Sequence, residues 1–460
     1  MTPIKNIFFS VFTNIWILAV NVGLNFIAPY FISVEDFGLF RKFMLYISFT
    51  GIMHLGFIDG IYLFFAGKGL INIERSIFNK YRLFFIVFQL VICFCFFIVG
   101  IILNNPILYY FAVAALFINV YNYGNYFYQS INEFKIFSLV NFLVNLILGL
   151  CIFFIFFVLK LKDYHYLIYS IILSYFFGSV LYEFFYHKHI KLEEERSLDL
   201  SIKVQIKNMF FLGGFILMGN LLFLYVINSD KWIVNFFFPT KMFAYYAFSG
   251  SIVGIVISLI TSVSMALYPT LVAAYTLKNI SYLKIITLIF SVLGLMTYFI
   301  AFIFIHLFFK KYVDSIEILR YMVLGLPAIS LIAVICVNYY KINSLGKRYV
   351  LDLLVVALIS ISLNIMVFYI FRSMVLISLA SVVSLYFALW YFSRKNDFLN
   401  FTIQDIVYCG VNLVVFLLLL SSGMNIYLSF TAYMFSSLSL SFIFYRVELG
   451  YFFNKIKLKK

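Results

Sequence analysis

Charge is scarce in this sequence. Only 11% of its 460 residues are charged, while 65% are hydrophobic and the mean hydropathy is +1.06. A soluble chain of this length would form about two or three domains, and each would need a charged surface. Because there are too few charges to coat such domains, most side chains must face lipid or other helices. The sequence therefore predicts a membrane protein.

Cysteine is also rare, and its distribution argues against two kinds of site. All five cysteines lie inside apolar runs, at Cys93, Cys95, Cys151, Cys336 and Cys409. An odd number in such positions supports neither a disulfide framework nor a zinc site. No metal-ligating or nucleophile motif appears, and "GKGL" (67–70) lacks the spacing of a nucleotide-binding loop. We therefore expect no metal, no cofactor and no enzyme activity.

Continuous apolar runs dominate what is present. A bilayer core of about 30 Å needs about 20 apolar residues in a helix. Barrel strands would alternate apolar and polar residues, whereas these runs are unbroken. The fourteen runs of sufficient length lie at 7–32, 41–66, 81–103, 107–130, 136–159, 164–186, 207–238, 243–275, 283–308, 315–341, 348–371, 374–392, 403–421 and 425–445. Since the last two pairs have tight turns between them, we predict an all-α polytopic membrane protein with 12–14 spans.

The basic residues indicate the orientation of these spans. With the N-terminus inside, 23 of the 33 lysines and arginines fall on inner segments, as the positive-inside rule requires. This predicts that both termini are cytoplasmic, and it explains the net charge of +15 without nucleic acid as a partner. The first run lacks a small-residue cleavage site, so we interpret it as a retained span. No connection exceeds about 20 residues, which leaves no soluble catalytic domain.

The longest connection, at 187–203, divides the first twelve spans into two halves that resemble each other. A shift of 206 residues places Asn14 on Asn220 and Asn25 on Lys231. An even number of spans in each half makes these parallel repeats, with a binding site expected between them. The predicted parts are an N-terminal six-helix lobe (1–190), a cytoplasmic inter-lobe loop (191–206), a C-terminal six-helix lobe (207–395), and an extra helix pair with a basic cytoplasmic tail (396–460).

The first span of each half carries a polar stripe on one helical face, because its polar residues follow helical spacing. The stripes comprise Asn14, Asn21 and Asn25 in the first half, and Asn220, Lys231 and Asn235 in the second. A charge buried in lipid costs several kcal/mol and tends to face a cavity or a partner. Lys231 and its neighbour Asp230 therefore favour a wet cavity between the stripes. Alternatively, Lys231 snorkels to the outer surface about 10 Å away, and Asp230 pairs with a loop.

Two segments carry a resemblance to a known family. The stretch "APYFISVEDFGLFRKFMLYISFTGIMHLGFIDGIYLFFAGK" (28–68) has an acidic-aromatic-Gly-x-aromatic loop and then an Asp59-Gly60 turn. The stretch "SDKWIVNFFFPTKMFAYYAFSGSI" (229–252) pairs an acid with a base before a tyrosine-containing loop, with Ala244 where glycine is usual. Over the first twelve spans the chain resembles the polysaccharide-transport (Wzx-type) flippases of the multidrug/oligosaccharidyl-lipid/polysaccharide exporter superfamily.

The resemblance implies two six-helix lobes that form a V-shaped bundle around a central cavity, with the last two helices as an addition. It implies translocation of an undecaprenyl-diphosphate-linked oligosaccharide, an O-antigen or capsule repeat unit, across the bacterial inner membrane. The expected partners are this lipid-linked oligosaccharide, membrane lipids and polysaccharide assembly proteins.

Other polar residues are candidates for the cavity, each with a structural alternative. Arg41 and Arg320, at the outer ends of their spans, could attract a diphosphate, or they could anchor the helices at the interface. Asn122 and Tyr126, in "NVYNYGNYFYQSIN" (119–132), suit sugars. Alternatively, Asn122 and the nearby Asn125 hydrogen-bond neighbouring helices.

Asp59 lies in "GFIDG", between Gly56 and Gly60. An intramembrane carboxylate could be a coupling-ion or proton site, or it could cap a broken helix. The two glycines form a GxxxG motif, which lets another helix approach closely.

Three functions remain open at this point. The most specific is a lipid-linked oligosaccharide flippase that works by alternating access, with Lys231 the leading candidate for binding the diphosphate. A polytopic polysaccharide polymerase or ligase usually needs a sizeable outer loop with catalytic residues, and the short loops argue against it. A small-molecule antiporter of the same superfamily would share the two-lobe plan.

Overall fold

The computed structural model describes residues 3–68, 75–189, 199–273, 277–343, 345–395 and 401–457, and nearly all of them are helical. Twelve described helices are long and apolar enough to cross a membrane, and the bent pair α2 and α3 makes a thirteenth. Helix α1 (Pro3–Phe31) occupies the first predicted run. The predicted fold class, an all-α polytopic membrane protein, is confirmed.

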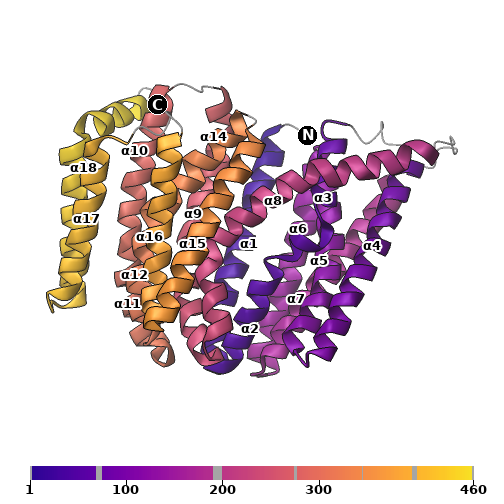
Figure 1. Cartoon of the computed structure of the whole chain (residues 1–460), viewed down its shortest axis with the longest axis horizontal. Helices are drawn as coiled ribbons and strands as arrows, with labels where there is room; N and C mark the ends of the chain where they lie inside the picture. Colours follow the sequence, from indigo (N-terminus) through magenta and orange to yellow (C-terminus); the bar gives the residue numbers. More distant parts are fainter. Residues whose placement is uncertain are drawn as a thin grey trace. The chain divides into compact units, whose positions relative to one another are not determined.

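The chain forms two compact units, Met1–Leu224 and Tyr225–Lys460 (Figure 1). Unit 1 contains α1, α2 (Val34–Ile47), η1 (Thr50–His54), α3 (Phe57–Phe65), α4 (Arg75–Ile102), α5 (Pro106–Ser130), α6 (Phe134–Phe153), η3 (Phe154–Val158), α7 (Tyr164–His189) and the first part of α8 (Asp199–Phe237). Unit 2 contains the rest of α8, α9 (Thr240–Ala273), α10 (Leu277–Leu293), α11 (Thr297–Phe308), α12 (Ser315–Met322), α13 (Leu326–Leu331), α14 (Val337–Ile342), α15 (Gly346–Phe371), α16 (Met374–Lys395), α17 (Ile403–Ser421) and α18 (Ile426–Lys457).

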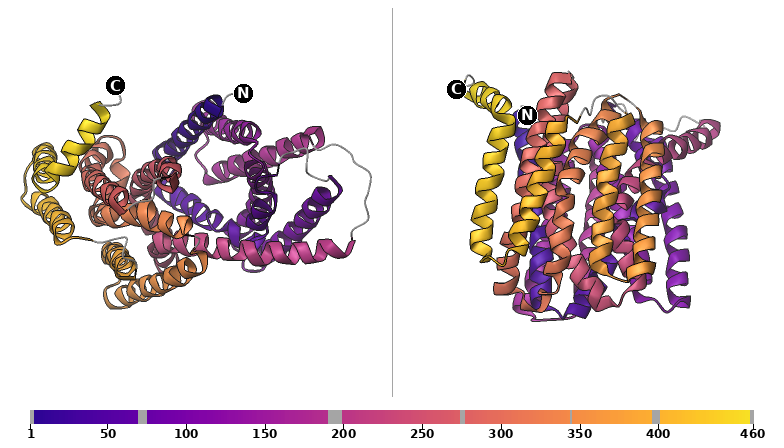
Figure 2. Two further views of the ribbon diagram at one scale, coloured as in Figure 1. Left: turned by 90° about the horizontal axis from the view of Figure 1, so that it is seen from above. Right: turned by 60° about the vertical axis from the view of Figure 1, so that its left-hand side comes forward.

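Helix α8 is a single continuous helix of 39 residues (Figure 2). It begins at Asp199, so residues 199–206 are helical where a loop was predicted up to 206, while 190–198 lie outside the described residues. At a rise of 1.5 Å per residue it is about 58 Å long, which exceeds a hydrocarbon core of about 30 Å. The boundary between the units falls inside this helix, after Leu224.

The second span is broken rather than continuous. Leu55 and Gly56 have left-handed φ angles of 49° and 86°, and the two halves of the span bend by 61°. A break inside a membrane requires partners for the backbone groups it releases. The Gln89 amide donates to Met53 O at 3.0 Å, and the Asn119 amide donates to Thr50 O at 3.3 Å. Both side chains are fully buried, so α4 and α5 support the break from inside the unit.

The GxxxG motif in this span does bring another helix close, as predicted, and that helix is α8. A Cβ atom at Gly60 would lie 2.6 Å from Met209 Cα, and one at Gly213 would overlap Gly56 O and Gly60 N. Real Cβ atoms do not approach backbone this closely, so the backbones of α3 and α8 are in direct contact. This contact needs glycine on both helices.

Two adjacent glycines of α8 are therefore expected to respond oppositely to alanine. Gly213→Ala would overlap the backbone of α3 and should cost at least about 2 kcal/mol of stability. Gly214→Ala meets no atom within 4 Å, and loss of a helical glycine should leave stability unchanged or raise it by up to about 1 kcal/mol. Thermal unfolding of both purified variants in detergent measures the difference. Equal unfolding temperatures would contradict the close crossing of α3 and α8.

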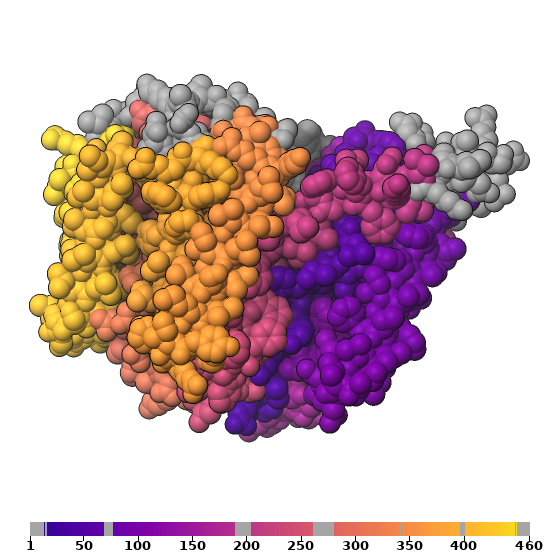
Figure 3. All heavy atoms as spheres, in the orientation of Figure 1, coloured from indigo at the N-terminus to yellow at the C-terminus, as the bar shows by residue number. Residues whose placement is uncertain are grey.

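The last two helices are anchored to the rest of unit 2 by a buried ion pair. Lys284 Nζ on α10 lies 2.5 Å from Asp405 Oδ2 on α17, and the two side chains are only 6% and 2% exposed. Tyr445 on α18 donates to the other carboxylate oxygen at 2.7 Å. Thr402 and Asp405 also form a capping box at the start of α17. Helices α17 and α18 lie at one edge of unit 2, in yellow in Figure 3. The ion pair and the Tyr445 hydrogen bond tie these two helices to α10.

Candidate functional site

Asp230 and Lys231, the acid and base inside an apolar run, make different contacts on α8. Asp230 is buried, and its carboxylate accepts a hydrogen bond from the Tyr246 hydroxyl at 2.6 Å and one from the Lys231 backbone N–H at 2.7 Å. Lys231 is half-buried, and its Nζ donates to Asn228 Oδ1 at 2.7 Å. The carboxylate is therefore held by a phenol, whereas the ammonium is oriented by an amide.

Helix α9 is shaped to receive the lysine side chain. A Cβ atom at Gly250 would lie 2.9 Å from Lys231 Cε, so glycine at this position leaves room for the stem of the lysine. Gly250 is four residues after Tyr246, which places both on one face of α9. The same face of α9 thus holds the aspartate and accommodates the lysine.

The preceding residue, Ser229, fixes the rotation of α8. Its hydroxyl lies 2.7 Å from Ser360 Oγ and accepts from the Asn364 amide at 3.2 Å, both on α15. Ser381 and Ser384 on α16 extend this network to Asn364 and Ser360. Ser229 of α8 is held against α15 by these bonds. Because successive helical residues point about 100° apart, this contact determines the directions in which Asp230 and Lys231 point.

In unit 1, two predicted candidates are brought together. Arg41 on α2 donates from Nη1 to Asn25 Oδ1 on α1 at 2.7 Å, and the Asn25 amide donates to Asn21 O at 2.8 Å. The Arg41 side chain is half-buried, and its Nε is a buried atom with no hydrogen-bond partner among the described residues. Arg41 thus points at the polar stripe of α1, and its contact there is again an amide oxygen.

The remaining stripe residues lie on the predicted helices. Asn21 and Asn220 are exposed, Asn235 is buried, and the side chain of Asn14 lies outside the described part. Asn220, Lys231 and Asn235 lie on one helix, α8. Whether the two stripes line one cavity stays a prediction.

Asp59 is placed at the broken helix. It is buried in the first turn of α3, where a carboxylate interacts favourably with the helix dipole. His54 Nδ1 accepts from the Gly56 N–H at 3.2 Å and lies 4.0 Å from the Asp59 carboxylate. This position fits the structural alternative, an acid at the start of a broken helix, and leaves ion coupling as a prediction.

One amide side chain of α5, that of Asn125, hydrogen-bonds to neighbouring helices. Asn125 Oδ1 accepts from the Asn141 amide on α6 at 2.7 Å and from the Tyr182 hydroxyl on α7 at 3.0 Å. The Tyr121 hydroxyl donates to Asn141 Oδ1 at 2.6 Å. For Asn125, the alternative of bonding between helices is therefore the observed one.

Three further candidates make few specific contacts. Asn122 is half-buried on α5, and the Tyr126 ring packs edge-on against Tyr62 with centroids 6.0 Å apart. Arg320 is half-buried on α12, with its guanidinium carbon 5.8 Å from the centroid of the Tyr321 ring. Its Nε is buried without a hydrogen-bond partner within the described ranges.

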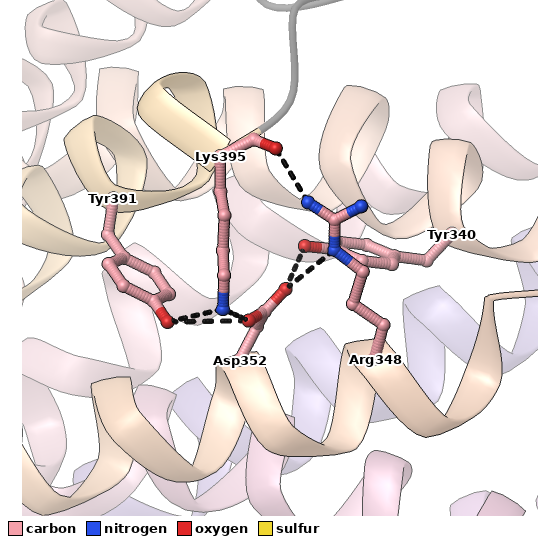
Figure 4. Close-up of polar contacts among 5 residues, drawn as sticks. All are labelled: Tyr340, Arg348, Asp352, Tyr391 and Lys395. Carbon is pink, nitrogen blue, oxygen red and sulfur yellow. Dashed lines mark hydrogen bonds and ion pairs between the residues drawn. The ribbon is translucent and has the colours of Figure 1, made fainter.

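A polar cluster that sequence reasoning missed joins α14, α15 and α16 (Figure 4). Asp352 is fully buried and accepts from the Tyr340 hydroxyl at 2.5 Å, while Lys395 pairs with its other oxygen and bonds Tyr391. Arg348 Nε lies 3.8 Å from the carboxylate, and Arg348 Nη2 donates to Lys395 O at 2.6 Å. Arg348 and Lys395 belong to the 23 basic residues predicted on the cytoplasmic side, and they thus also compensate a buried acid. The only sequence signal was the i, i+4 spacing of Arg348 and Asp352.

No group of three or more histidine, cysteine or acidic side chains is positioned to hold a metal ion in the part of the chain that the structure describes. The site is therefore characterised by cations, amides and phenols.

No protein-family model matches the sequence, and no curated protein matches it either. Solved structures do match. The structure is similar to the lipid II flippase MurJ in an inward closed conformation, with a TM-score of 0.65 and 18% identity, over 96% of this chain and 99% of that chain. It is similar to an inward-facing multidrug resistance MATE family transporter of the MOP superfamily, with a TM-score of 0.54 and 14% identity, over 84% and 95%. It is also similar to a mutant of the Vibrio cholerae MATE transporter VcmN, with a TM-score of 0.53 and 11% identity, over 86% and 98%.

At these identities the likeness shows the fold, which is that of MurJ and of MATE transporters of the MOP superfamily. The MurJ match leaves out about 18 residues (4% of 460). Helices α17 and α18 together span residues 403–457. Most of the extra helix pair therefore belongs to the shared fold.

Proposed function

We propose that this protein is a flippase for an undecaprenyl-diphosphate-linked oligosaccharide, an O-antigen or capsule repeat unit. It carries this lipid across the bacterial inner membrane by alternating access of two lobes, with both termini cytoplasmic. The observation that carries the proposal is the placement of Lys231, a half-buried cation in a membrane helix, oriented by the Asn228 amide and seated over Gly250.

Amide-held cations are suited to an anionic ligand. An amide oxygen orients a cation and brings no negative charge of its own, while the neighbouring Asp230 carboxylate also interacts with the charge of Lys231. Arg41 is held in this way by Asn25, and Lys231 by Asn228. A diphosphate is a compact double anion, for which charge-assisted hydrogen bonds from arginine and lysine are strong. Lys231 is therefore the main diphosphate ligand in this proposal, and Arg41 and Arg320 are secondary ones.

The remaining candidates serve the sugars and the coupling. The amides Asn14, Asn21, Asn220, Asn235 and Asn122, together with Tyr126, supply donors and acceptors for sugar hydroxyls. Asp230 positions Lys231, since its carboxylate bonds the Lys231 backbone. Asp59, at the break of the second span, is the candidate coupling site. The polyprenyl tail remains in lipid, and no nucleic acid, metal or cofactor takes part.

The neighbouring structures support a carrier over an enzyme. MurJ is described as a flippase of lipid II, and the MATE proteins as multidrug transporters. The polymerase or ligase alternative lacks this support. The small-molecule antiporter keeps the support of the MATE fold and is the second candidate.

Deleting the gene in its host separates the three functions. For a flippase we expect surface polysaccharide to disappear, the lipid-linked repeat unit to accumulate at the inner leaflet, and drug susceptibility to stay unchanged. A polymerase deletion would instead leave single repeat units on the surface. An antiporter deletion would raise drug susceptibility with surface polysaccharide intact, and either of these last results would refute the flippase. Complementation with the wild-type gene is the control.

A further inference from the structure

A groove of about 590 Å³ opens on the surface of unit 1 between α5, α6 and α7, which lie together in Figure 1. We call it the α5–α7 groove. Its lining is almost wholly apolar and includes Phe117, Cys151, Phe154, Leu159, Tyr169 and Leu173. The volume falls within the roughly 300–1,000 Å³ of ordinary ligand pockets.

The groove is formed at a local irregularity of α6. The helix ends in the five-residue π-helix η3, after which Leu159 N–H donates to Phe154 O at 2.8 Å and Lys160 adopts a left-handed φ of 54°. π-Turns inside helices are rare and occur mostly at functional sites. Here the wider turn ends α6 beside α7.

Much of the lining is exposed on the surface of unit 1. Phe154, Leu159 and Leu173 expose 51%, 60% and 51% of their surface, although they belong to or adjoin membrane-spanning helices. An apolar groove of this kind fits a hydrocarbon chain, because the hydroxyl of the lining residue Ser170 already donates to Tyr166 O at 2.7 Å.

One end of the groove lies where η3 ends and α7 begins, which is where a membrane span would reach the lipid head groups. The hydroxyl of the lining residue Tyr169 is 3.2 Å from that of Tyr110, whose ring packs edge-on against His165. Tyrosines gather in this way at the membrane interface. The loop that follows η3 lies at the same end, since His165 is two residues beyond it.

That loop carries two lysines on the predicted outer side, where the positive-inside rule disfavours them. Lys160 and Lys162 are exposed and flank Leu161, whose N–H donates to Ile155 O in the groove lining at 2.9 Å. Asp163 is held by His165, with its Oδ1 accepting the backbone N–H at 3.0 Å and lying 2.5 Å from Nδ1. Burial alone would raise the pKa of Asp163, but these hydrogen bonds and the His165 charge lower it below its ordinary value.

We propose that the α5–α7 groove binds a phospholipid with an anionic head group, its acyl chain along Phe154 and Leu173 and its phosphate beside Lys160 and Lys162. The apolar walls match the acyl chain of such a lipid, and the lysines at the head-group end match its phosphate. The site would recognise anionic over zwitterionic lipid through charge. It does not depend on the transport cargo proposed above.

The test is lipid binding to the purified full chain, measured by native mass spectrometry after delipidation. The probes are phosphatidylglycerol and phosphatidylcholine with identical acyl chains. Two lysines near a phosphate should favour phosphatidylglycerol by about 5- to 25-fold. Lys160→Gln with Lys162→Gln should reduce this preference to about one.

The matched control removes the same charge from the other predicted outer loop that carries two lysines. Lys310→Gln with Lys311→Gln alters exposed residues that do not line the groove and should keep the preference. An equal loss in both double variants would mean that overall surface charge attracts the lipid, and the proposed site would be wrong.

A second variant tests the groove itself. Cys151→Phe fills the groove and should reduce binding of both lipids, whereas Cys95→Phe on the exposed surface of α4 should not. Unchanged binding in a well-folded Cys151→Phe protein would overturn the proposal. Should Cys151→Phe fail to fold, the lysine variants decide the question independently.

Discussion

Replacing Lys231 with alanine is expected to nearly abolish export of the lipid-linked repeat unit. A charge-assisted hydrogen bond contributes about 1.5–3 kcal/mol, so its loss should lower the rate by about 10- to 150-fold. Surface polysaccharide should fall and the lipid-linked intermediate should accumulate in a strain whose only copy carries Lys231→Ala. Immunoblotting of the surface glycan and mass spectrometry of extracted lipids measure the two effects.

The structure provides matched controls for this variant. Lys241→Ala removes an exposed lysine in the first turn of α9, ten residues along the chain, and should leave export unchanged. Lys231→Arg keeps the charge but must fit the larger guanidinium over Gly250, where the lysine stem is already close. It should therefore retain part of the activity. Normal export by Lys231→Ala at normal expression would remove Lys231 from the mechanism.

Replacing Lys284 with methionine is expected to destabilise unit 2 strongly. It would leave the Asp405 carboxylate, which is only 2% exposed, without its cation. Removing one partner of a buried pair costs about 3–5 kcal/mol, because the other charge stays buried and uncompensated. A fall in the unfolding temperature of the purified protein, with earlier proteolytic release of α17 and α18, would measure this.

A double-mutant cycle separates the ion pair from side-chain packing. Lys284→Met combined with Asp405→Asn should be more stable than the sum of the two single effects predicts, since neither charge is then left alone. Lys347→Met, at an exposed position on α15, should change stability by less than about 0.5 kcal/mol. Additive effects in the cycle would show that the ion pair does not anchor the helix pair.

The spans were predictable from the sequence because lipid imposes a local rule. Every helix that crosses a bilayer must be apolar over about 20 residues, and this can be read without knowing any neighbour. The GxxxG contact was also predictable from one segment, because two glycines four residues apart let another helix approach closely. Its partner Gly213 lies 153 residues beyond Gly60. The break at Leu55 and Gly56 was not predicted, because Gln89 and Asn119, which satisfy it, come from two other helices.

The polar site was predictable only in part. Asp230 and Lys231 stood out because charges are costly in an apolar run. The roles of the two side chains depend on Tyr246 and Gly250 on another helix, which no spacing within α8 indicates. Asn125 could suit a sugar or a neighbouring helix, and only the packing of α6 and α7 decided for the helices.

By itself, the sequence determined that the protein is helical, where its spans run and which polar residues they contain, because hydrophobicity and helical spacing act over a few turns of one segment. The tertiary structure alone decided which charges neutralise each other, as in Lys284 with Asp405 and Lys395 with Asp352, and which are oriented by amides. Such pairs join residues 43 to 121 positions apart. The free energy of a buried charge depends on atoms within a few ångströms of it, and those atoms are supplied by distant segments of the chain.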